Sequence, residues 1–101
     1  MNVLRHLFVG ADRPTTYPVL ASRMGVTERE AQAAVESARK AGIPVISGAR
    51  GLWLASSSQE AREWVERQRS RAIHMMETAQ GVEKWAEVQE LSGQPTLWEA
   101  A

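Results

Sequence analysis

The chain has 101 residues, no cysteine and a formal net charge of zero. This length suits one domain with an appendage, and the lack of cysteine excludes disulfide bonds and thiolate metal sites. No apolar run approaches the roughly 18 residues of a membrane span, and the N-terminus lacks the apolar core of a signal peptide. We therefore expect a cytoplasmic protein, in a bacterial host cell, that makes no contact with a membrane.

Charge is distributed unevenly along the chain. Residues 1–55 hold seven basic and four acidic side chains, a net charge of +3, whereas residues 56–101 hold five basic and eight acidic ones, a net charge of −3. A mildly basic first half followed by an acidic second half favours a nucleic-acid-binding module, although only weakly.

The first predicted element is a helix over residues 1–10, with apolar side chains on one face. These are Val3, Leu4, Leu7 and Phe8. A loop over residues 11–14 follows. Either Thr15 or Thr16 can cap the next helix, in whose first turn Pro18 loses no hydrogen bond.

Two helices joined by a tight turn come next. Gly25 is suited to the left-handed conformation that often ends a helix. Thr27 and Glu30 form a capping-box pattern that opens the second helix, and Gly42 ends it. The inward positions of this second helix keep helical spacing and are Ala31, Ala34, Val35, Ala38 and Ala41. The order of helix, turn and helix is typical of a helix-turn-helix.

A β-hairpin is predicted immediately afterwards. Residues 43–47 are suited to a strand, in which Pro44 indicates an edge position. Residues 48–51 supply a glycine-flanked turn, and residues 52–54 return as the second strand. We expect Trp53 to fill the core, since a large aromatic side chain usually does so in a small domain.

Residues 20–55 resemble the winged helix-turn-helix of the biotin-operon repressor N-terminal domain, and in particular the short winged-helix proteins of bacteriophages. The resemblance is carried by Leu20–Ala21, Met24–Thr27, Ala31, Val35, Ala38, Ala41–Ile43 and Gly51–Leu54. It implies an α+β fold, mainly α with a hairpin wing, in a domain over residues 1–58. It also implies binding of double-stranded DNA, for control of transcription or of phage replication.

In this family the second motif helix enters the major groove. The expected DNA-binding residues are Arg23, Thr27, Arg29, Gln32, Ala33, Glu36, Ser37, Arg39, Lys40 and Arg50. Arg29 and Gln32 are suited to purine edges, and Arg50 at the wing tip is suited to a phosphate or the minor groove. Glu28 and Glu36 repel phosphates, so this face is less basic than is usual in the family.

A long helix over residues 59–91 is predicted to follow. It runs to about Gln80, and residues 84–91 either continue it or fray. Its 3-4-3-4 seam comprises Val65, Gln68, Ala72, Met75, Ala79, Val82 and Ala86. Such a seam is typical of paired helices. We expect a homodimer through Val65, Ala72, Met75, Ala79 and Val82; the alternative is a helix that folds back on its own domain with a bend at Gly81.

Residues 92–101 are predicted to form a flexible tail. Within it, Gln94, Leu97 and Trp98 look like the short peptide by which bacterial replication and repair proteins bind the sliding clamp. The alternative is that Leu97 and Trp98 pack against the long helix. Clamp binding would make the protein an interaction module rather than a DNA-binding protein.

Catalytic patterns are missing from the sequence. No glycine-rich phosphate loop, no serine–histidine–aspartate set and no paired carboxylates in an apolar setting are present. His74, alone among basic and apolar neighbours, is no metal ligand. We therefore expect neither an enzyme nor a bound cofactor or metal.

Overall fold

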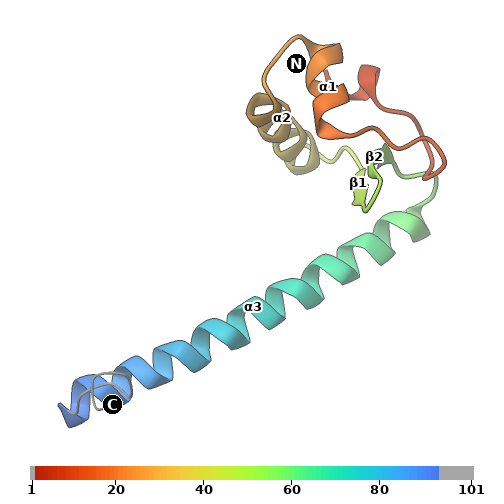
Figure 1. The fold of residues 1–101 in the computed structure, drawn as a ribbon. Coiled ribbons are helices and arrows are strands. Elements are labelled where there is room, and N and C mark those ends of the chain that lie inside the picture. The colour runs from red at the N-terminus through yellow and green to blue at the C-terminus, as the bar shows by residue number, and fades with distance from the viewer. Residues whose placement is uncertain (1, 94–101) are drawn as a thin grey trace. The chain divides into compact units, whose positions relative to one another are not determined.

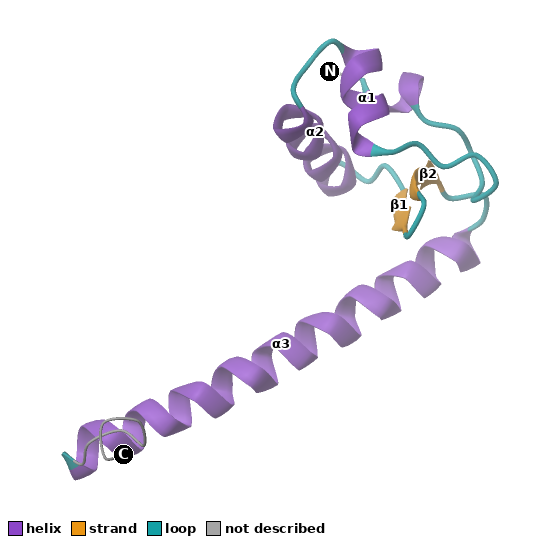
Figure 2. Ribbon diagram, in the orientation of Figure 1, coloured by secondary structure: helices purple, strands orange, loops and turns teal. Residues whose placement is uncertain are grey.

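A computed structural model describes residues 2–93 of the chain (Figure 1). The elements in chain order are a 3-10 helix η1 (Val3–His6), α1 (Tyr17–Met24), α2 (Glu28–Lys40), β1 (Val45–Gly48), β2 (Gly51–Leu54) and α3 (Ser58–Ser92). The described chain is mainly helical with one two-stranded antiparallel hairpin, so the α+β class is confirmed (Figure 2). It divides into two compact units, Met1–Trp64 and Val65–Ala101, and the first therefore includes the start of α3, beyond residue 58.

The turn between α1 and α2 has the predicted chemistry. Gly25 adopts φ +69° at the end of α1, and the Val26 amide donates to the Ala21 carbonyl at 3.0 Å. The capping box is present, since the Glu30 amide donates to Thr27 Oγ1 at 3.1 Å while the Glu30 carboxylate accepts from the Thr27 amide. Both ends of this turn are thus fixed by local hydrogen bonds.

The core of the N-terminal unit lies where α1, α2 and one face of the hairpin meet η1. Its buried apolar side chains are Val3, Leu7, Leu20, Ala21, Ala31, Val35, Ala38, Val45, Leu52 and Leu54. The inward positions predicted for α2 at Ala31, Val35 and Ala38 are confirmed, whereas Ala34 is partly buried and Ala41 is exposed. Small residues on α2 allow close approach of the helices around Leu20, which is fully buried.

The helix predicted over residues 1–10 is wrong beyond its first turn. Only η1 is helical, and residues 8–10 are bonded to the hairpin instead: the Leu54 amide donates to the Phe8 carbonyl and the Gly10 amide donates to the Leu54 carbonyl. These two bonds at 2.8 and 2.9 Å offer the backbone an alternative to the helix. Phe8 is consequently 43% exposed rather than part of a helical apolar face.

The hairpin differs from expectation in two respects. The first strand starts at Val45, so Pro44, which lacks the N–H of a ladder, lies outside it. Trp53 is only partly buried, contrary to the prediction that it fills the core. Side chains alternate between the faces of a strand, and Leu52 and Leu54 occupy the core face, so Trp53 lies on the other face.

Helix α3 continues beyond Gln80 to Ser92, and it has no bend at Gly81. Its start is capped by Ser57, whose hydroxyl accepts from the Glu60 amide at 3.1 Å. It runs without interruption through Gly81 to Ser92, where Gly93 adopts φ +63°. The side chains of residues 69–85 are all exposed. The Gln94–Trp98 peptide lies outside the described residues.

Candidate nucleic-acid interface

A groove of about 340 Å³ lies between the hairpin turn, α2 and the N-terminus of α1. Its lining comprises Thr16, Tyr17, Pro18, Glu28, Gln32, residues 47–51 and Leu52. Arg50 from the hairpin and Gln32 from α2 therefore border one concave surface. A basic and an amide side chain so placed are suited to a phosphate and to a base edge, respectively.

The exposed side of α2 continues from this groove. Arg29, Glu36 and Lys40 are all exposed, and their spacing of four and seven residues places them along one side of the helix. Ala33 lies among them, and its small side chain leaves space on this side of the helix. In residues 2–93 the ion pairs are Arg69–Glu66 and His74–Glu77, so neither Arg29, Lys40 nor Arg50 is neutralised by a neighbouring carboxylate.

The position of Arg50 is set by backbone contacts rather than by its own side chain. Gly51 adopts φ +137°, and a Cβ at this position would lie 2.7 Å from the Thr15 carbonyl. Thr15 and Leu52 exchange two backbone hydrogen bonds of 2.8 Å each. These contacts hold the hairpin turn against the start of α1, whose N-terminal backbone carries partial positive charge beside the groove.

Two of the expected DNA-binding arginines are engaged within the fold. Arg23 donates to the His6 carbonyl at 3.0 Å and to Thr15 Oγ1, and its guanidinium lies over the Phe8 ring. Arg39 donates through Nε to the Val45 carbonyl at 2.9 Å. Neither side chain lines the groove. The sequence pattern shows that both are basic, but gives no indication of these long-range partners.

Two further expected residues also have other surroundings. The Thr27 hydroxyl serves the capping box. Ser37 lines a separate hollow of about 510 Å³, together with Asn2, Ala34 and Ala41. The groove instead includes Thr16 and Tyr17, which no sequence pattern singles out as DNA-binding residues. Thr16 is the N-cap of α1 and its side chain makes no capping hydrogen bond, a detail that a capping pattern alone does not reveal.

Carboxylates also face this region. Glu28 lines the groove, and Glu36 lies on the exposed side of α2. Glu28 stands in the first turn of α2, where a negative charge is stabilised by the helix dipole. A structural role therefore accounts for Glu28, while Glu36 is a solvated charge among the exposed cations.

No group of three or more histidine, aspartate or glutamate side chains that could hold a metal ion occurs among residues 2–93. Within the same range, no helix combines the length and apolar character needed to cross a membrane. The chain matches no protein-family model, no curated protein and no solved structure.

Proposed function

We propose that the N-terminal unit, Met1–Trp64, binds double-stranded DNA as a winged helix-turn-helix domain. In this proposal α2 enters the major groove, with Arg29 and Gln32 nearest the base edges, and the β1–β2 hairpin is the wing. The role is control of transcription or of phage replication. The resemblance of residues 20–55 to winged helices and the order α1, α2, β1, β2 support it.

The observation that carries the proposal is the shared groove of Arg50 and Gln32. A winged helix contacts DNA through a helix and a hairpin together, which requires that both present side chains to the same side of the domain. The unpaired state of Arg29, Lys40 and Arg50 adds to this support, because a cation without a carboxylate partner is available to a phosphate.

The engagement of Arg23 and Arg39 within the fold limits the expected affinity. Three exposed cations remain on the α2 face and hairpin turn: Arg29, Lys40 and Arg50. Each phosphate neutralised contributes a slope of about −0.9 to the dependence of log affinity on log salt. The slope for one protomer should therefore be no steeper than about −3.

Substitution of Arg50 tests the proposal. Arg50→Ala should weaken binding about equally on all duplex sequences and make the salt slope shallower by about one unit. Arg5→Ala is the matched control, since Arg5 is an exposed arginine of η1 that does not line the groove. Equal losses from both substitutions, or a change in sequence preference alone for Arg50→Ala, would contradict a phosphate contact at the hairpin turn.

A second candidate function is capture of a replication protein such as the sliding clamp by the Gln94–Trp98 peptide. The net charge of −3 over residues 56–101 favours a protein partner rather than DNA for this half of the chain. Deletion of residues 93–101 should abolish clamp binding and leave DNA binding intact. Leu97→Ala with Trp98→Ala should reproduce the loss, and clamp binding that survives the deletion would exclude the peptide.

A further inference from the structure

The C-terminal part of α3 carries a row of positions along one face, here called the seam, whose spacing is symmetric about Glu77. Its positions alternate in steps of three and four and are Val65, Gln68, Ala72, Met75, Ala79, Val82, Ala86 and Gln89. Met75 is 72% exposed and Val82 is 65% exposed. A hollow beside the seam is lined by His74, Met75, Thr78, Ala79 and Val82. An apolar face of this kind is expected to be covered by another helix.

We infer that this face pairs with the same face of a second copy, and that the two α3 helices run antiparallel. When the second helix runs in the opposite direction and the two helices are aligned at Glu77, each seam position lies opposite another seam position. The resulting layers are Met75 with Ala79, Ala72 with Val82, Gln68 with Ala86, and Val65 with Gln89. The first three layers each combine an alanine with a larger side chain, which is the arrangement that fills space between two helices.

Parallel pairing is disfavoured by the same residues. It would stack Ala72, Ala79 and Ala86 each on its own copy, leaving gaps, and would place Gln68 and Gln89 against themselves. The interface would then alternate between layers of small side chains and layers of large ones. Two helices at one constant separation cannot pack both kinds of layer well. The antiparallel arrangement removes this conflict.

The charges along α3 independently favour the antiparallel copy. Before the centre of the seam, Arg67, Arg69 and Arg71 outnumber Glu66, whereas after it Glu83, Glu87 and Glu90 outnumber Lys84. Antiparallel pairing brings the net basic segment of each helix beside the net acidic segment of the other, whereas parallel pairing places segments of like net charge side by side. At the positions that flank the seam, Arg69 faces Glu83 of the second copy.

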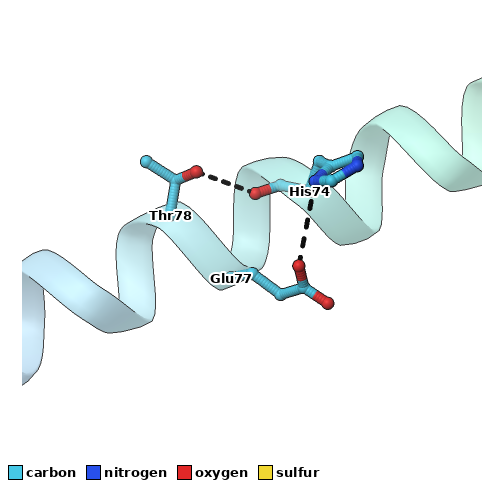
Figure 3. A network of polar contacts seen from close by, with 3 residues as sticks. All are labelled: His74, Glu77 and Thr78. Atoms are coloured by element: carbon cyan, nitrogen blue, oxygen red, sulfur yellow. Dashed lines mark hydrogen bonds and ion pairs between the residues drawn. The ribbon is translucent and has the colours of Figure 1, made fainter.

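Polar groups that border the seam, His74 and Thr78, are already partnered within α3. His74 Nδ1 lies 3.8 Å from the Glu77 carboxylate, and both side chains are largely exposed (Figure 3). The Thr78 hydroxyl donates to the His74 carbonyl at 3.0 Å. Glu77 follows the seam residue Met75 by two positions, which places it away from the paired face. The centre of the dimer therefore buries Met75 and Ala79, while the Glu77 carboxylate stays on the outer side.

The mass of the full-length protein tests the pairing. Light scattering at high micromolar concentration should give twice the chain mass of 11.2 kDa. Ala79→Glu should lower the mass to that of one chain, whereas Gln80→Glu, one residue away on the outer side, should not. A single-chain mass for the unsubstituted protein, or the same response to both substitutions, would overturn the inference. This result does not depend on whether the N-terminal unit binds DNA.

Disulfide trapping tests the direction, because the natural chain has no cysteine. Ala72→Cys and Val82→Cys should cross-link with each other when the two full-length variants are mixed and oxidised. Neither should cross-link alone, since in the antiparallel layer order residue 72 lies about 15 Å along the axis from its own copy. Cross-linking of Ala72→Cys alone would indicate parallel helices, and the absence of any cross-link in the mixture would overturn the pairing.

Discussion

The guanidinium of Arg39 lies over the indole ring of Trp64, with Cζ 4.7 Å from the ring centroid. Arg39 also donates to the Val45 carbonyl, and Trp64 Nε1 lies 3.4 Å from Ser47 Oγ, to which it donates. These contacts join the end of α2, the first strand and the beginning of α3 within the N-terminal unit. Arg39 therefore stabilises the fold, although its place on α2 alone favours a role in DNA binding.

Arg39→Lys should destabilise the N-terminal unit by about 2 kcal/mol. Lysine keeps the charge but loses the planar group that stacks on Trp64 and the Nε–H that reaches Val45; such contacts contribute about 0.5–3 kcal/mol each. Urea unfolding followed by tryptophan fluorescence measures the change. Lys40→Ala, at the exposed neighbouring position, should change stability by less than about 0.5 kcal/mol. Equal effects of the two would show that the stacked geometry is unimportant.

Leu20→Ala should cost about 3 kcal/mol, because Leu20 is fully buried and its truncation leaves a cavity between α1 and α2. Val19→Ala is the matched comparison, since Val19 is its neighbour on α1 and is 43% exposed. The midpoint of thermal unfolding should fall by several degrees only for Leu20→Ala. A Val19 variant as unstable as the Leu20 variant would contradict the assignment of the core face.

Gly51→Ala should be more damaging than Gly25→Ala, although both glycines have positive φ. A Cβ on Gly51 would meet the Thr15 backbone at 2.7 Å, whereas a Cβ on Gly25 would meet nothing within 4 Å. Gly25→Ala should therefore cost only the conformational strain of about 1–2 kcal/mol. Gly51→Ala should exceed it by also displacing the hairpin from Thr15. Chemical denaturation of both variants gives the comparison, and equal losses would exclude the close approach.

The local features of the N-terminal unit could be predicted because local chemistry decides them. Gly25 ends α1 through its tolerance of positive φ, and the Thr27–Glu30 capping box fixes the start of α2, so three residues specify the turn. The inward positions of α2 follow from helical spacing. The two-residue hairpin turn between Gly48 and Gly51 follows from its flanking glycines.

The features that could not be predicted depend on contacts distant in sequence. The helix predicted over residues 1–10 does not extend to Gly10, because Phe8 and Gly10 form backbone hydrogen bonds with Leu54. Trp53 lies off the core, because Leu52 and Leu54 occupy the inward face of the strand. Likewise, nothing near Arg23 in the sequence indicates the His6 carbonyl as its partner. The candidate groove is therefore better defined by the structure, which adds Thr16 and Tyr17 to it.

Gln32→Ala should alter sequence preference more than affinity for mixed-sequence DNA. Gln32 lines the groove and is exposed on α2, and a glutamine amide suits the hydrogen-bonding edge of adenine. Loss of one such contact should lower discrimination at one base pair by about 1–3 kcal/mol. Selection of preferred sites from a random duplex pool, carried out with the unsubstituted protein and with Gln32→Ala, measures this discrimination. An unchanged preference with a uniform loss of affinity would assign Gln32 to the DNA backbone.

We propose that the α2 face and the hairpin turn contact DNA phosphates and bases. The most direct test is fluorescence anisotropy of a labelled mixed-sequence duplex titrated with the full-length protein at low and at moderate salt. The proposal predicts micromolar binding that weakens as salt rises, through release of counterions from the contacted phosphates. The absence of binding at high micromolar protein and low salt would contradict it, and would leave the N-terminal unit as a scaffold for protein interactions.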